Sequence, residues 1–165
     1  MLFISLNVWP ISAQRVVTKK PARPVTERLP VPPLVQTDDQ EAAIRVEKLL
    51  NQSGQKYTRL GMGAWIIRRN GQNLRYFQIV LSHRSGTLIT QVTVATAKSL
   101  QVNEAAPNLL RLANKLDYVK VGLDTGDDLF VRNEARLKSL DLEEFTNNLD
   151  RVAAAADLVY AGVRR

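Results

Sequence analysis

Three stretches of the chain carry apolar side chains at the three- and four-residue spacing of an α-helix. The first begins at Asp38, which is followed three residues later by a glutamate, the spacing of a capping box, and Gly54 marks its end. The second is expected to start near Pro107, because proline suits the first turn of a helix. The third begins at Asp141, again with a glutamate three residues later, and is predicted to stop at Gly162.

Between these helices apolar and polar positions alternate, which is the period of β-strands. Three such segments follow the first helix, joined by turns at Asn70-Gly71 and Ser85-Gly86, and two follow the second. The strands are expected at Ala64–Arg68, Leu74–Ser82, Thr87–Ala97, Tyr118–Leu123 and Leu129–Leu137. Short turns between period-two strands favour antiparallel pairing. The pattern therefore predicts one α+β domain over residues 38–162, of order α-βββ-α-ββ-α, with an antiparallel sheet and helices packed on it.

The segment before the first helix has a different composition. Six of the seven prolines lie at or before Pro33. Proline removes backbone donors and favours extended geometry, so residues 15–37 are expected to be a proline-rich disordered linker. Residues 1–14 combine an apolar run with the ending Ser12-Ala13-Gln14, which resembles a truncated signal peptide without its basic start. We therefore expect an exported or periplasmic protein, with a cytoplasmic location as the alternative.

The residue types present exclude several kinds of chemistry. The chain has no cysteine, which excludes a disulfide, a thiolate metal site and a cysteine nucleophile. The only histidine, His83, has no acid within twenty residues in sequence and is interpreted as a surface residue at a strand end. No catalytic motif occurs, so we expect no catalytic residue, no cofactor, no metal and no enzyme. No window holds the run of about 18 apolar residues that a membrane span requires.

An aspartate cluster between the last two strands looks at first like a metal site. Asp124, Asp127 and Asp128 lie within five residues, whereas a calcium loop spreads its ligands over about twelve. The cluster fits a hairpin turn better, with Gly126 expected at the position of positive φ.

The formal charge of +7 is unevenly distributed along the chain. Residues 1–37 hold five bases and one acid, and residues 55–103 hold seven bases and no acid. In this acid-free segment, bases at strand ends lie close to aromatic residues. These bases fit a solvated basic rim or a surface for an acidic polypeptide partner. The alternative is single-stranded nucleic acid, which binds sheets that carry bases and aromatics. The candidate partner-binding residues are Trp65, Arg68, Arg69, Arg75, Tyr76 and Arg84.

The C-terminal half also resembles a known family. The segments concerned are Leu109-Leu110-x-Leu112-Ala-Asn114-Lys-Leu116, Val119-Lys-Val-Gly-Leu-Asp124, Leu129-Phe-Val-Arg132-x-Glu134, Leu140-Asp-Leu-Glu-Glu-Phe145 and Val152-Ala-Ala-Ala-Ala-Asp157. They are similar to the YbjN family, whose members resemble type III secretion chaperones in fold. The resemblance covers about Asp38 to Tyr160 and is strongest from Leu109 onward.

This resemblance implies a bacterial, non-catalytic module with a regulatory or chaperone-like role, which binds a partner polypeptide. It also implies a homodimer, because secretion chaperones of this shape usually dimerise. Those chaperones are typically acidic, whereas this domain is basic, and the difference argues against a true effector-secretion chaperone.

Overall fold

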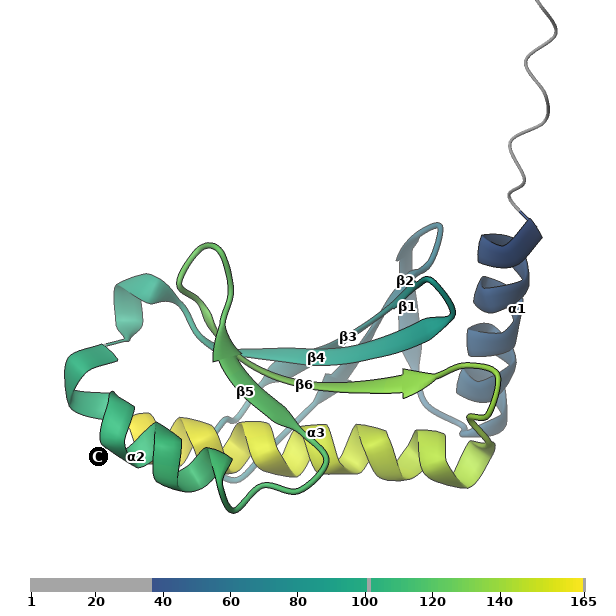
Figure 1. The fold of residues 1–165 in the computed structure, drawn as a ribbon. Helices are drawn as coiled ribbons and strands as arrows, with labels where there is room; N and C mark the ends of the chain where they lie inside the picture. The colour runs from purple at the N-terminus through teal and green to yellow at the C-terminus, as the bar shows by residue number, and fades with distance from the viewer. Residues whose placement is uncertain (1–36, 101, 165) are drawn as a thin grey trace, which may run out of the picture. The chain divides into compact units, whose positions relative to one another are not determined.

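The computed structural model describes residues 37–100 and 102–164 of the chain, and Figure 1 shows their fold. The predicted signal peptide, residues 1–14, lies outside the described residues, as does the predicted linker, residues 15–37, apart from Thr37. Both stay predictions, and so does the expectation of export that depends on them.

The described residues form an antiparallel six-stranded sheet with helices packed on it, which confirms the predicted α+β class. The helices are α1 (Thr37–Gln52), the 3-10 helix η1 (Ala97–Ser99), α2 (Val102–Ala113) and α3 (Leu142–Val163). The strands are β1 (Tyr57–Gly61), β2 (Ala64–Arg69), β3 (Phe77–Arg84), β4 (Thr87–Ala95), β5 (Lys120–Leu123) and β6 (Leu129–Arg136). Their order across the sheet is β1-β2-β3-β4-β6-β5, so β6 pairs with both β4 and β5.

Three elements differ clearly from the sequence-based expectation. Strand β3 begins at Phe77 rather than at Leu74, and residues 70–76 connect it to β2. The order is α-ββββ-α-ββ-α, with β1 added, because four of the five β1 residues are exposed and the strand lacks a buried period-two pattern. Helix α2 begins at Val102, so Pro107 lies inside it rather than in its first turn. A proline at this place cannot donate the hydrogen bond that the preceding turn would accept.

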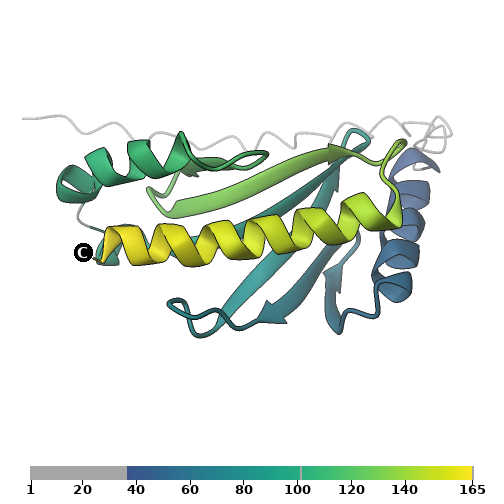
Figure 2. The same cartoon turned by 90° about the horizontal axis from the view of Figure 1, so that it is seen from below.

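Helix α3 runs along one face of the sheet, as Figure 2 shows from below. Its buried side chains recur at helical spacing, and they meet the inward-facing side chains of the strands in one core. Burial of a large aliphatic or aromatic side chain contributes about 1.5–3 kcal/mol, so this layer holds the helix on the sheet. The helix contributes Phe145, Leu149, Val152, Ala156 and Val159, and the strands contribute Trp65, Ile67, Ile79, Leu81, Leu88, Val92 and Val131.

The opposite face of the sheet carries no described helix (Figure 1). Strand side chains alternate between the two faces, so residues between the core positions point to this side. We call it the open face, and its members come from all six strands. They are Thr58, Ala64, Ile66, Arg68, Gln78, Val80, Ser82, Arg84, Thr87, Ile89, Gln91, Thr93, Lys120, Gly122, Phe130, Arg132, Glu134 and Arg136.

Close approach of α2 to α3 depends on a glycine. Gly162 lies inside α3 rather than after its end, and a Cβ at this position would overlap Cδ1 of Leu112 on α2. The other predicted helix-ending glycine, Gly54, does follow α1 and has a φ of 66°. Gly54 therefore acts as a terminator, and Gly162 as a packing residue.

The predicted N-cap of the last helix is confirmed. The Asp141 carboxylate accepts a hydrogen bond from the Glu144 amide, at 2.8 Å. We expect Asp141→Ala to lower the free energy of unfolding by about 1 kcal/mol, because it leaves that amide without its acceptor. Urea denaturation followed by circular dichroism would measure the change. Asp141→Ser should retain most of the stability, and an alanine variant as stable as wild type would contradict this role.

Candidate functional site

The open face is organised in rows that cross the sheet. The central row takes one residue from each strand, in the order Thr58, Ile66, Val80, Gln91, Arg132 and Lys120. Ile66 and Val80 lie directly opposite each other, and Ile89 lies opposite Ser82 in the neighbouring row. These three aliphatic side chains are half-buried although no described helix covers them. They give the face an apolar centre.

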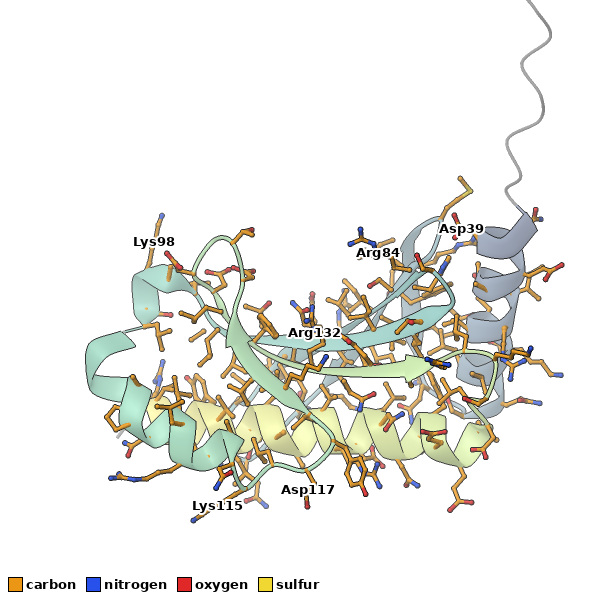
Figure 3. All side chains as sticks on the ribbon, in the orientation of Figure 1. Asp39, Arg84, Lys98, Lys115, Asp117 and Arg132 are labelled. Carbon is orange, nitrogen blue, oxygen red and sulfur yellow. The ribbon has the colours of Figure 1, made fainter. Side chains whose placement is uncertain are left out.

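Five bases and one acid surround this apolar centre. Thr87 on β4 pairs with Arg84 of β3 on one side and with Arg136 of β6 on the other. These two arginines lie at the end of the sheet where β3 turns into β4. Arg68 lies on β2, opposite Gln78, near the other end of the sheet. The remaining bases, Lys120 and Arg132, face each other on β5 and β6. Figure 3 shows Arg84 and Arg132 on this side of the molecule and Lys115 on the other.

The acid of the open face, Glu134, is shared by two of these bases. Its carboxylate lies 2.9 Å from Nζ of Lys120 and 3.0 Å from Nε of Arg132. The hydrogen bond from Lys120 lowers the pKa of Glu134, burial works against this, and the positive charges of Arg132 and Lys120 lower it further. Glu134 therefore stays ionised and offsets charge on the β5–β6 side. Among the described residues, Arg68, Arg84 and Arg136 have no such acidic partner.

Phe130 is the aromatic residue of the open face, and its ring is already engaged. The Arg132 guanidinium lies over it, 5.0 Å from the ring centroid. The ring also lies close to Gly122 on β5, where an added Cβ would be 3.0 Å from Cζ of Phe130. A cation–π contact on one side and backbone beside it leave little of this ring for a ligand.

Three of the sequence-predicted residues lie together. Arg68, Arg69 and Tyr76 line a hollow of about 520 Å³ on the open face, together with Gln78 and Thr93. The Tyr76 side chain is strongly exposed, at 83 %. Arg69 contributes less charge than the sequence suggests, because its guanidinium lies 3.3 Å from the Asp150 carboxylate on α3. Among the described residues that line this hollow, Arg68 is therefore the cation without an acidic partner.

The other three predicted residues lie elsewhere. Trp65 is fully buried, and its Nε1 donates to Glu47 on α1 at 3.2 Å, so a partner cannot contact its indole. Trp65 points inward because it lies two residues from Ile67 along β2, and side chains two residues apart in a strand lie on the same face of the sheet. Arg75 lines a separate hollow with Tyr160 and Arg164 near the end of α3. Arg84 belongs to the open face but lies at the opposite end of β3 from the hollow.

His83 differs from its predicted surface position. Its side chain is only 6 % exposed and lies between the Trp65 ring, 6.1 Å away by centroids, and Asp39 of α1. The carboxylate of Asp39 is 3.9 Å from Nδ1, which has no hydrogen-bond partner. The fold brings α1 over the strand end, and sequence distance could not show this. One distant carboxylate is not the cluster of acids that an acid–base site would need.

The aspartate turn is confirmed as a turn, with one correction. The Asp124 carboxylate accepts hydrogen bonds from the amides of Gly126 at 2.8 Å and Asp128 at 3.0 Å. The positive φ, 60°, belongs to Asp127 and not to Gly126. Within residues 37–100 and 102–164, no three His, Asp or Glu side chains are grouped as metal ligands would be.

Sequence reasoning missed the residues that β5 and β6 add to the open face. Phe130, Arg132, Glu134 and Arg136 alternate with the buried Leu129 and Val131, and this period-two pattern was a usable signal. The sequence does not show that β6 pairs with β4, and this pairing places β6 beside the strands of the acid-free segment, residues 55–103.

No described helix is long and apolar enough to cross a membrane. No family model matches the chain, and no curated protein is similar to it in sequence.

Solved structures do share the fold, which is that of type III secretion chaperones and of YbjN. A chain of the heterodimeric ExoU–SpcU complex from the type III secretion system of Pseudomonas aeruginosa is 17 % identical, with a TM-score of 0.54, covering 72 % of this chain and 97 % of that one. YbjN from E. coli is 16 % identical, with a TM-score of 0.55, covering 70 % and 85 %. A chain of the HopA1–SchA chaperone–effector complex is 12 % identical, with a TM-score of 0.54, covering 73 % and 97 %. These likenesses confirm the predicted fold, and at such low identity they show the fold alone.

Proposed function

We propose that this protein is a non-catalytic module, regulatory or chaperone-like in role, that binds a partner polypeptide on its open face. The observation that carries the proposal is the open face itself: no described helix covers it, its centre is aliphatic, and three of its arginines have no acidic partner among the described residues. Uncovered apolar surface rimmed by polar residues is typical of a protein-interaction site. The proposal requires no cofactor and no catalytic residue.

The structural likenesses support this role without establishing it. Two of the similar chains come from complexes of two different proteins, ExoU–SpcU and HopA1–SchA, and the second is a chaperone with its effector. The fold is therefore compatible with holding a second polypeptide. The homodimer implied by the family resemblance stays a prediction, and the proposal does not depend on it.

Site-specific photo-crosslinking in the native host would test the proposed face. A photoreactive phenylalanine at Gln91 or Val80, in the central row, should crosslink one and the same protein. The control position is Ala154, which is exposed on α3 on the other side of the sheet. Capture of that protein from Ala154 as well, or from neither face position, would overturn the proposal.

The captured protein, once purified, should bind the full chain directly. We expect the double variant Val80→Glu/Ile89→Glu to weaken this binding at least about tenfold, because it places two charges in the apolar centre of the contact. Leu158→Glu, on exposed α3 surface, is the matched control and should leave the affinity within about twofold. Isothermal titration calorimetry would measure both affinities, and equal losses in the two variants would contradict the assignment of the face.

A further inference from the structure

The unpaired charges of the open face lie at its two ends. Arg84 is at one end of β3, and Arg68 on β2 lies opposite Gln78, six residues from Arg84 along β3. At about 3.3 Å per residue this separates the two arginines by about 20 Å along the strands. Ile66 and Val80, which pair directly, lie between them. The two strands thus form a lane with a cation at each end and aliphatic side chains in the middle.

The other side of the open face is less suited to an acidic ligand. Lys120 and Arg132 share the Glu134 carboxylate, at 2.9 and 3.0 Å. An incoming acid would meet the negative charge of Glu134 and would have to displace it from both bases. A carboxylate that approaches Lys120 and Arg132 would be repelled by Glu134. The lane over β2 and β3 is therefore the more favourable place for carboxylates.

We propose that the partner segment is an extended polypeptide with two acidic residues about six positions apart and an apolar residue between them, lying along β2 and β3. Its carboxylates pair with Arg68 and Arg84, and its apolar side chain packs on Ile66 and Val80. This inference rests on the proposed function and adds the chemistry and spacing of the segment that is bound.

The aliphatic centre favours a polypeptide over single-stranded nucleic acid. Proteins that bind single strands stack bases on exposed aromatic rings. In the described part of this face, the Phe130 ring is taken by Arg132 and Gly122, and Trp65 is buried in the core. Tyr76, at the edge of the hollow, is the exposed ring that remains there, and one ring does not make a stacking platform.

Selection from a displayed library of random 12-residue peptides on the immobilised full chain would test the inference. The test variant is Arg68→Glu/Arg84→Glu. The matched control is Arg111→Glu/Lys115→Glu, which makes the same change of charge at two exposed positions of the α2 region, in a hollow away from the open face. All three proteins keep the same basic N-terminal segment, so peptides that bind there are common to all selections. Circular dichroism would confirm that both variants fold.

The expected result is enrichment, on wild type and on the control, of peptides with two acids five to seven positions apart around an apolar residue. Their affinity for Arg68→Glu/Arg84→Glu should fall at least about tenfold, because attraction at both ends becomes repulsion. Moving the two acids next to each other in a synthetic peptide should weaken binding as well. That combination would support the inference.

Other outcomes would overturn it in distinguishable ways. Enriched peptides that compete with the photo-crosslinked partner but carry no spaced acids would refute the pairing of two carboxylates with Arg68 and Arg84 and leave the proposed function intact. Equal loss of affinity in the test and control variants would show that only net charge matters. Tight binding of a single-stranded oligonucleotide, abolished by Arg68→Glu/Arg84→Glu, with no enriched peptide, would refute both the inference and the proposed function.

Discussion

Replacing Trp65 by alanine is expected to lower the free energy of unfolding by about 3–5 kcal/mol, the usual cost of removing a large buried aromatic side chain. The Trp65 side chain is fully buried and lies directly opposite Leu81 of β3. Its indole N–H also donates to Glu47, which connects α1 to the sheet. The substitution therefore opens a cavity and leaves the Glu47 carboxylate without one donor.

Urea denaturation followed by circular dichroism would measure this loss, since the substitution itself removes a fluorophore. Trp65→Phe is the matched control, because it keeps most of the apolar volume and removes only the indole hydrogen bond and part of the ring. We expect it to cost about 1–2 kcal/mol. A loss below about 1 kcal/mol for Trp65→Ala would contradict the position of this side chain in the core.

The second large effect is expected at Asp157 on α3, which holds the loop between β2 and β3. Its carboxylate accepts hydrogen bonds from the amides of Asn73 and Leu74 and from the Asn73 side chain, each at 2.8 Å. Three hydrogen bonds to one carboxylate are worth more than a surface ion pair, and we expect Asp157→Ala to cost about 2–3 kcal/mol at neutral pH. Asp117→Ala, at an exposed aspartate, controls for the loss of a single negative charge.

The stabilisation by Asp157 should depend on pH in a defined direction. Burial raises the pKa of Asp157, but the hydrogen bonds from Leu74 and Asn73 outweigh it, so the pKa lies below its usual value. A lowered folded-state pKa stabilises above the unfolded pKa, about 3.9, and the stabilisation is lost as the pH falls through the folded value. The stability difference between wild type and Asp157→Asn should therefore be largest above about pH 5 and shrink in acid. Urea denaturation at pH 7, 5 and 3 would measure it, and a difference that grows in acid would contradict this role.

The fold was largely predictable because its signals are local. The glutamate three residues after Asp141 depends on neighbours in sequence, and the helix cap lies where the pattern placed it. The chain also leaves β2 at Asn70 as predicted, but residues 70–76 form a longer connection to β3 than an Asn-Gly hairpin turn. Strand β1 was missed because its residues are mostly exposed, so its place in the sheet depends on pairing with β2 and not on an apolar pattern. The sequence does not show the early start of α2, because proline favours the first turn of a helix, whereas this helix continues on both sides of Pro107.

The candidate site was predicted less completely, for two physical reasons. The run Ala-Trp-Ile-Ile in β2 is apolar on both faces, so its pattern could not show whether Trp65 or Ile66 points to the core. The open face also combines strands that are far apart in sequence, and β6 brings Arg132 and Arg136 beside the acid-free segment. Arg68, Tyr76 and Arg84 could be identified from charge and strand position alone, whereas the pairing of Arg69 with Asp150 depends on the tertiary fold.

Strand β1 forms one border of the sheet, and among the described residues its outer backbone groups have no backbone partner. An exposed edge strand of this kind can pair with strands of other molecules, and repeated pairing leads to fibres. Here the pairing register of β1 shifts between Arg59 and Gly61, and the strand has only five residues. Such an irregularity bends and twists a strand, so a second molecule could add only a short ladder of hydrogen bonds. At the β1 edge, the molecule can thus keep a broad sheet accessible to a partner while this strand resists uncontrolled self-assembly.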